Sequence, residues 1–261
     1  MTLLPACGEK VPEGRMRGDF PEVSSEAMEA LNSAVAAIRR KRPRSVAVFT
    51  GAGVSADSGI PTFRGDGGLW RSYRAEDLAT PSAFARNPLL VWEWYEWRRS
   101  VVRAAQPNDA HKAIARLDDA VVVTQNVDGL HARAGSRRII ELHGNLFRAR
   151  CVHDGSIHDA IEPFPELPPK CACGALLRPD IVWFGETLPD GVFEEAVDAV
   201  TNADLLLVIG TSGVVYPAAG LVPLHRGLSI EINPQASGAC TFSVEAKAAE
   251  ATPLIVDAIV A

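Results

Sequence analysis

The spacing of apolar and polar positions predicts alternating helices and strands along most of the chain. Apolar residues at helical spacing predict a helix over Ser24 to Arg40, and the run from Val46 to Val48 predicts a buried strand after it. Further strands are predicted at 120–125, 138–142, 177–186, 205–209 and 228–232, and further helices within 70–102, at 108–117 and at 192–200. This alternation predicts an α/β fold built on a Rossmann-like, doubly wound parallel sheet, with a ligand at the carboxyl ends of its strands.

Two segments depart from this pattern. Residues 1–22 are rich in proline, glycine and charge without periodicity, which predicts a mobile N-terminal extension. Residues 147–175 hold several prolines and three cysteines, which predicts a small inserted lobe that is either stapled by metal or rich in loops. We therefore expect one domain over 23–261. Its Rossmann part is expected at about 23–66, 118–146 and 176–261, and its small lobe, which includes a helical module, at about 67–117 and 147–175.

Composition narrows the class of protein. The chain has 261 residues, 47% of them hydrophobic, and a formal charge of -6, which argues against nucleic acid as the main partner. No stretch is apolar for long enough to span a membrane, and the first residues lack the features of a secretory signal, so we expect a cytoplasmic protein. The chain has five cysteines, and an odd number in a protein expected to be cytoplasmic argues against a disulfide framework. Three of the cysteines lie close together in the sequence, as metal ligands do.

A glycine-containing loop follows the first predicted strand, in the segment FTGAGVSADSGIPTFRG. Gly51 and Gly53 carry no Cβ, so the backbone there can approach a phosphate closely. The pattern Gly51-x-Gly53-x-x-Ala56 is by itself a weak dinucleotide fingerprint, and the acidic residue usual about 20 positions later is missing. The loop predicts a nucleotide site with a layout unlike that of ordinary dehydrogenases.

Polar side chains gather where the predicted strands end. They are Ser55, Arg64, Gln125, Asn126, Asp128 and His143. His143 is a candidate general base because the pKa of histidine lies near working pH, although a hydrogen-bonded structural histidine would fit the position equally well. On the aromatic helix, core packing does not explain Tyr95 and Arg98, three residues apart, and we expect this pair to face a cleft.

Several motifs taken together resemble one family. GAGVSADSGIPTFRG, TQNVDGLH, ELHGN, VWFGE, GTS and EIN occur in that order between about 30 and 255, and the set resembles the sirtuins, the NAD-dependent protein lysine deacylases. The resemblance implies a Rossmann-type domain, a small zinc lobe, and NAD consumed between them. It also implies that the acyl oxygen of the modified lysine attacks the nicotinamide-bearing ribose carbon, giving nicotinamide and O-acyl-ADP-ribose. Such an enzyme needs positioning and a base rather than its own nucleophile.

The same resemblance implies roles for individual residues. His143 matches the catalytic histidine, and Val182, Trp183, Phe184 and Gly185 match the strand that pairs with the substrate peptide backbone. Implied NAD contacts are Gly51, Ala52, Gly53 and Ser55 at the pyrophosphate; Phe63, Arg64 and Trp70 on the covering loop; Gln125, Asn126 and Asp128 at the ribose and nicotinamide; Gly210, Thr211, Ser212 and Asn233 at the adenosine; and Ala248 at the adenine edge.

A further likeness concerns the acyl group. RAEDLATPSAF together with WYEWRR resembles the bacterial and mitochondrial subclass that removes succinyl, malonyl or glutaryl groups. Tyr95 and Arg98 match its carboxylate-binding pair, and Ala79 matches the small residue that leaves room for a longer acyl chain. Because a guanidinium can bind a carboxylate with two hydrogen bonds, we expect acidic acyl-lysines on proteins or peptides to be the preferred substrates. Deacetylation is expected as a further activity. We expect the protein to be a monomer.

The metal lobe departs from the family pattern of two cysteine pairs. Cys171 and Cys173 form the second pair, but the first holds Cys151 with Asp154 where a cysteine is expected. Because zinc accepts carboxylate and imidazole ligands as well as thiolates, the three cysteines with Asp154 or His153 form one expected site, with His158 a weaker fourth candidate. The alternative is a lobe that folds without metal.

Three other functions compete with deacylation. The glycine loop alone would fit a nicotinamide-dependent oxidoreductase, which release of free nicotinamide during turnover would exclude. The altered metal lobe would fit an NAD-binding or acyl-lysine-binding module with little turnover. ADP-ribosyl transfer to proteins would use the same cofactor, and we rank it below deacylation.

Overall fold

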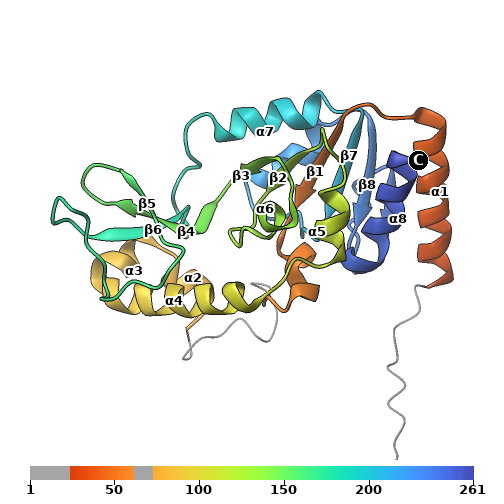
Figure 1. Ribbon diagram of the computed structural model, residues 1–261. Coiled ribbons are helices and arrows are strands. Elements are labelled where there is room, and N and C mark those ends of the chain that lie inside the picture. Colours follow the sequence, from red (N-terminus) through yellow and green to blue (C-terminus); the bar gives the residue numbers. More distant parts are fainter. Residues whose placement is uncertain (1–23, 62–72) are drawn as a thin grey trace, which may run out of the picture.

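A computed structural model describes residues 24–61 and 73–261 of the chain (Figure 1). The predicted extension at 1–22 lies outside the described residues, and so do Phe63, Arg64 and Trp70 of the expected covering loop. None of the helices within the described ranges is long and apolar enough to cross a membrane.

A six-stranded parallel sheet forms the centre of the molecule. Its strand order is β3-β2-β1-β7-β8-β9, and every neighbouring pair runs parallel. The strands are β1 (Val46–Thr50), β2 (Val121–Thr124), β3 (Arg138–Glu141), β7 (Leu205–Ile209), β8 (Leu228–Ile232) and β9 (Phe242–Val244). The predicted doubly wound sheet is confirmed, although β9 was not predicted. The strand order reverses between β1 and β7, and open α/β sheets bind their ligands at such a switch point.

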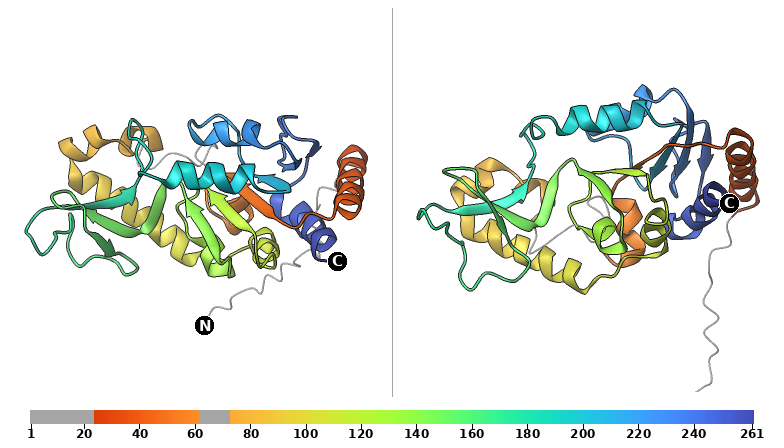
Figure 2. Two further views of the ribbon diagram at one scale, coloured as in Figure 1. Left: turned by 90° about the horizontal axis from the view of Figure 1, so that it is seen from above. Right: turned by 45° about the horizontal axis from the view of Figure 1, so that its top comes forward.

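Helices cover both faces of this sheet (Figures 1 and 2). One face packs against α1 (Ser25–Lys41), α5 (Asp109–Ile114) and α8 (Ala248–Val260), and the other against α7 (Val192–Thr201) and the 3-10 helix η2 (Ala218–Leu224). Neighbouring strand residues point to opposite faces, so Val48 belongs to the first core and Phe49 to the second. All five residues of β7 are buried, because both of its faces are covered.

A smaller lobe lies beyond one edge of the central sheet, at the left in Figure 1. It contains a helical module and a three-stranded antiparallel sheet in the order β5-β4-β6. The elements are α2 (Ala75–Leu78), α3 (Pro81–Arg86), α4 (Pro88–Ala104), β4 (Gly144–Cys151), β5 (Ile157–Asp159) and β6 (Leu177–Ile181); the short helices η1 (Ala52–Ser58) and α6 (Leu130–Ala134) follow β1 and β2.

The lobe's sheet differs from the sequence-based expectation in two respects. We expected the strand at 177–186 to lie in the Rossmann part, but β6 pairs with β4 in the small lobe. We also expected a loop-rich lobe from residue 147 onward, but β4 continues through that point to Cys151. Buried and partly exposed positions alternate along β6, which is the pattern of a strand with one covered face rather than of a central parallel strand.

Helix α4 is bound to this sheet by two buried side chains. The indole of Trp92 donates a hydrogen bond to the Leu177 carbonyl at 2.8 Å. The Nε of Arg99 donates to the Leu146 carbonyl at 2.6 Å, and its guanidinium also pairs with Glu96 at 2.6 Å. Arg99 is fully buried, so its charge is compensated only by neighbouring protein groups.

Replacement of Arg99 by methionine should therefore destabilise the protein. The variant leaves the Leu146 carbonyl without its donor and Glu96 without its buried cation, so we expect the free energy of unfolding to fall by about 3 kcal/mol. Chemical denaturation of both proteins measures the change. The control is Arg116→Met, which removes a surface pair with Asp257, formed at 2.7 Å by two half-exposed side chains, and should cost less than about 1 kcal/mol. Equal effects would contradict the prediction.

Candidate active site at the carboxyl edge of the sheet

The glycine loop packs directly against the end of β7. A Cβ at Gly53 would lie 2.8 Å from both the Cα and the carbonyl oxygen of Gly210, and one at Gly51 would lie 2.9 Å from that oxygen. The Gly53 amide donates to the Gly210 carbonyl at 2.8 Å. These contacts give the two glycines a packing role, because a larger residue would push the loop away from β7.

Three polar side chains expected in the site are joined by hydrogen bonds beside this loop. Asn126 donates from Nδ2 to the Gly51 carbonyl at 3.0 Å and to Ser55 Oγ at 3.2 Å. Ser55 in turn donates to Asp128 Oδ2 at 2.8 Å. Burial raises the pKa of Asp128, and hydrogen bonds from the Leu130 amide and from Ser55 oppose that rise. The carboxylate is thus held in one orientation at the end of β2.

Two buried histidines lie behind these residues, and the sequence analysis did not select them. His111 Nε2 lies 3.4 Å from Ser55 Oγ, and His131 Nε2 lies 3.0 Å from Thr50 Oγ1. Their rings pack together with centroids 4.8 Å apart. Burial lowers the pKa of His111 to about 4; burial, and then the neighbouring His111, lowers that of His131 to about 3. Both rings are therefore neutral near pH 7. His111 contacts Ser55, and His131 contacts Thr50 at the end of β1.

His143 stands at the end of β3 with a defined tautomer. Its Nδ1 lies 3.1 Å from the Gln125 carbonyl oxygen, which can only accept, so Nδ1 carries the proton and Nε2 keeps its lone pair. Burial lowers the pKa of His143, and the hydrogen bond to Gln125 opposes this. The side chain is therefore a neutral imidazole near pH 7, which is the form that can accept a proton.

The ends of β2, β7 and β8 are linked through Thr211. Gln125 Nε2 donates to Thr211 Oγ1 at 2.9 Å, and Asn233 Nδ2 donates to the Thr211 carbonyl at 2.8 Å. Ser212 is exposed beside them, and Ala248 is buried at the start of α8. The residues expected on the adenosine side are thus drawn from three separate elements at one edge of the sheet.

A pocket of about 60 Å³ joins the sheet edge to helix α4. The sheet side contributes Ser55, Asn126 and Asp128, and α4 contributes Arg98. Tyr95 is not at the pocket surface: it is fully buried, and its phenol oxygen accepts a hydrogen bond from Trp183 Nε1 at 2.8 Å. The expectation that both residues face a cleft therefore holds for Arg98 and is wrong for Tyr95.

The segment expected to pair with a peptide lies between the two parts of the molecule. The Val182 amide donates to the His143 carbonyl, and the Phe184 amide donates to the Ala79 carbonyl, both at 3.0 Å. Phe184 is 48% exposed, so part of its side chain is available to a ligand. These bonds fix the segment next to both His143 and Ala79.

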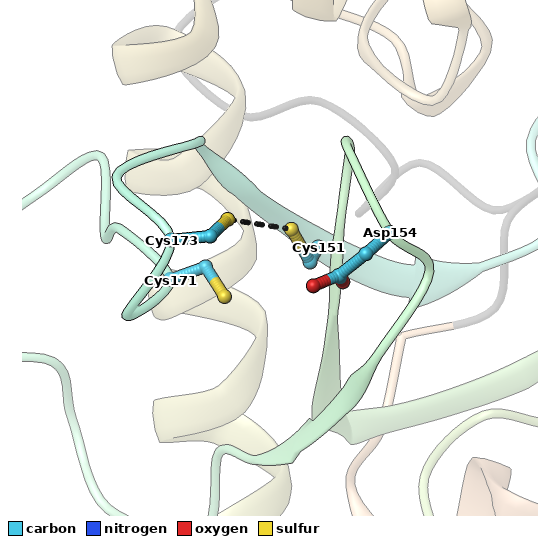
Figure 3. A group of neighbouring side chains, drawn as sticks. All are labelled: Cys151, Asp154, Cys171 and Cys173. Carbon is cyan, nitrogen blue, oxygen red and sulfur yellow. Dashed lines mark hydrogen bonds between the residues drawn. The ribbon is translucent and has the colours of Figure 1, made fainter.

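The cysteine-bearing lobe brings four possible metal ligands together. The ligand atoms of Cys151, Asp154, Cys171 and Cys173 all lie within 4.8 Å of one another, and the sulfurs of Cys151 and Cys173 are 3.6 Å apart. Figure 3 shows the four side chains converging: Cys151 at the end of β4 and Asp154 just after it on one side, and Cys171 and Cys173 from the loop before β6 on the other. A tetrahedral zinc ion with Zn–S bonds of about 2.3 Å requires sulfurs roughly 3.8 Å apart, so this set fits zinc.

The lobe also discriminates between the candidate fourth ligands. His153 is not part of the group; its backbone amide donates to Cys151 Sγ at 3.4 Å. The Ser156 hydroxyl and amide donate to Asp154 Oδ1 at 2.6 and 2.9 Å, and the pKa of Asp154 is lowered to about 2, first through the hydroxyl. Asp154 is therefore an ionised carboxylate in the fourth position of the cluster.

A doubly wound nucleotide-binding sheet with polar strand ends, joined to a small lobe with a possible metal site, defines the class of this protein. Comparison with known families identifies it further: residues 51–217 match the model of the Sir2 family. The chain belongs to that family. This confirms the likeness first drawn from sequence motifs.

Individual relatives agree with the family assignment. The chain is 51% identical to NAD-dependent protein deacylase 2 of Pyrobaculum aerophilum over 227 residues, covering 83% of this chain and 91% of that protein. It is 48% identical to the NAD-dependent protein deacylase of Mycobacterium tuberculosis, covering 80% and 94%. A crystal structure of a Sir2 homologue in complex with NAD matches with a TM-score of 0.80 and 44% identity, covering 89% and 93%.

Metal analysis tests the cysteine cluster. We expect the purified protein to retain about one zinc per chain, and Asp154→Ala to lower zinc affinity by about tenfold or more because one of four ligands is lost. His153→Ala is the matched control and should retain zinc as the wild type does. Elemental analysis during titration with a chelator measures both. Zinc well below one per chain in the wild type would show that the lobe folds without metal.

Proposed function

We propose that this protein is an NAD-dependent protein lysine deacylase that prefers acidic acyl groups: succinyl, malonyl and glutaryl. The observation that supports it most is the pocket in which Arg98 of the small lobe meets Asn126 and Asp128 of the sheet edge. The relatives named as NAD-dependent protein deacylases support the reaction class, and their names leave the acyl group open. An oxidoreductase has no comparable support.

NAD would lie along the carboxyl edge of the sheet, where the residues present fit it. The polar residues that follow β2, β7 and β8 are joined through Thr211 at the carboxyl edge of the sheet, and Ser55, Asn126 and Asp128 are already held by one another. When bound, NAD supplies a ribose carbon from which nicotinamide can leave. The remaining NAD contacts, including those at Phe63, Arg64 and Trp70, stay predictions.

His143 would act as the general base. Its Nδ1 proton is directed to the Gln125 carbonyl, so Nε2 is the atom that accepts a proton from a ribose hydroxyl. The peptide would pair with Val182 to Gly185. Because the amides of Val182 and Phe184 already donate within the protein, a peptide strand would use the carbonyl groups of that segment.

Arg98 would bind the carboxylate at the end of an acidic acyl chain. Its guanidinium stands over the rings of Trp94 and Tyr95, 5.1 and 5.6 Å from their centres. Ala79, small and buried, would leave room for the acyl chain. An acetyl group offers no carboxylate, so it gains nothing from this cation. A monomeric state and a cytoplasmic location remain predictions.

Acyl preference tests the role of Arg98. We expect Arg98→Met to lower the ratio of kcat/KM for a succinyl-lysine peptide to that for the matching acetyl-lysine peptide by about tenfold to a hundredfold, because a charge-assisted pair is lost. Arg98→Lys keeps the charge without the planar fork and should fall between the two. Mass spectrometry of the NAD-dependent reaction measures both rates and the O-acyl-ADP-ribose product. An unchanged ratio in Arg98→Met would exclude the assignment.

The pH dependence tests His143. Only the neutral imidazole can accept a proton, and burial lowers its pKa, so activity should be lost only as pH falls below the ordinary histidine value of about 6.5. We expect the acidic limb of kcat/KM to have its midpoint below that value, with a plateau from there toward neutral pH. His143→Ala should abolish most activity across the range. A midpoint above the ordinary value would contradict this assignment.

A further inference from the structure

The chain passes from the central sheet into the small lobe at the residue proposed as the base. Glu141 ends β3, His143 follows it, and β4 begins at Gly144 (Figure 1). The backbone of Gly144 lies so close to β6 that a Cβ there would collide with the Asp180 carbonyl group. The backbone that carries His143 is therefore packed directly against the end of β6.

Arg148 of β4 binds two carboxylates at this junction. Its Nη1 lies 2.9 Å from Oε2 of Glu141 in the central sheet, and its Nε donates to Oδ2 of Asp180 in β6 at 3.0 Å. The other carboxylate oxygen of Glu141 accepts from Nδ2 of Asn145 at 2.6 Å. The side chains of Glu141 and Asp180 are 19% and 16% exposed, so water screens these contacts only in part. One guanidinium thus ties β3, β4 and β6 together.

The two carboxylates stand close in sequence to the groups that would meet a substrate. Glu141 lies two residues before His143, and Asp180 lies two residues before Val182. The Val182 amide donates to the His143 carbonyl at 3.0 Å, so the two segments are also joined through their backbones. A cation that holds Glu141 and Asp180 at once therefore restrains His143 relative to the segment expected to pair with a peptide.

We propose that Arg148 is a positioning residue for deacylation, because its two ion pairs hold the general base in register with the bound peptide. This inference rests on the proposed roles of His143 as the base and of Val182 to Gly185 as the peptide segment. A general base must lie within hydrogen-bond reach of the proton that it accepts. A small displacement of the lobe would therefore slow the reaction without removing any group that contacts the substrate.

The first test changes the guanidinium and leaves the base and the peptide segment intact. Arg148→Gln removes both ion pairs, and we expect kcat for an acyl-lysine peptide to fall by about three- to tenfold while KM for NAD changes by less than about twofold. Arg148→Lys keeps the charge but not the planar fork that reaches two carboxylates, so its kcat should fall between those of Arg148→Gln and the wild type. The control Arg116→Gln removes the surface pair with Asp257 and should leave kcat unchanged.

A double-mutant cycle tests the path through Glu141. Glu141→Gln keeps the size of the side chain and removes its charge, so it should lower kcat as Arg148→Gln does. The double variant should lower kcat no further than the more affected single variant, because both changes break one network. Fully additive losses, or an unchanged kcat in Arg148→Gln, would overturn the inference.

Denaturation of each variant separates positioning from stability. We expect all variants to be folded at the assay temperature, so that kcat falls without a matching loss of folded protein. A fall in kcat that equals the unfolded fraction would overturn the inference, since the ion pairs would then act on stability alone. If Arg148→Gln does not fold, Glu141→Gln gives the same comparison.

His143→Ala, measured in parallel, separates the two levels of the argument. If His143→Ala keeps the activity of the wild type, the proposed base and the inference both fail. If His143→Ala abolishes activity while Arg148→Gln leaves kcat unchanged, only the role of Arg148 fails.

Discussion

The close contact between the backbones of Gly53 and Gly210 is the constraint on which the site depends. Because neither residue carries a side chain, the loop after β1 can lie against the end of β7 at the point where the strand order reverses. In this position Ser55 of η1 donates to Asp128, and the carbonyl of Gly51, just before η1, accepts from Asn126. A Cβ at either position would displace the loop from the end of β7, and with it the hydrogen bonds from Ser55 to Asp128 and from Asn126 to the Gly51 carbonyl.

The second constraint is the attachment of α4 to the small lobe. Two adjacent arginines on this helix point in different directions. Arg99 is buried and donates to the Leu146 carbonyl in β4, whereas Arg98 lines the pocket. The buried cation has little freedom, because its charge must stay beside Glu96. Its neighbour is thereby held at the pocket wall beside Asp128. The stability of the lobe and the position of Arg98 are thus coupled through two adjacent residues of one helix.

Sequence alone predicted the elements whose periodicity is strong and local. The helix at 25–41 and every strand of the central sheet except β9 followed from apolar spacing, which also located the polar residues after several of these strands. The sequence did not show that β6 belongs to the sheet of the small lobe. Which strands pair depends on contacts between segments that lie far apart in the chain. His111 and His131 were missed for the same reason: one follows the Asn108 cap and the other closes TQNVDGLH, and only the folded structure shows their burial under Ser55 and Thr50.

The metal lobe shows how a departure from a motif can be accommodated. A carboxylate is more strongly hydrated than a thiolate. It therefore needs hydrogen-bond partners that hold it in the cluster. Ser156 supplies two hydrogen bonds to one oxygen of Asp154, which leaves the other oxygen for a metal. The Nε2 atom of His158 lies 3.1 Å from Ser156 Oγ and 3.6 Å from Cys171 Sγ. It thus connects the serine that holds Asp154 to the Cys171–Cys173 pair. The residues around Asp154 would hold it in place as a ligand, as outer partners do in other metal sites.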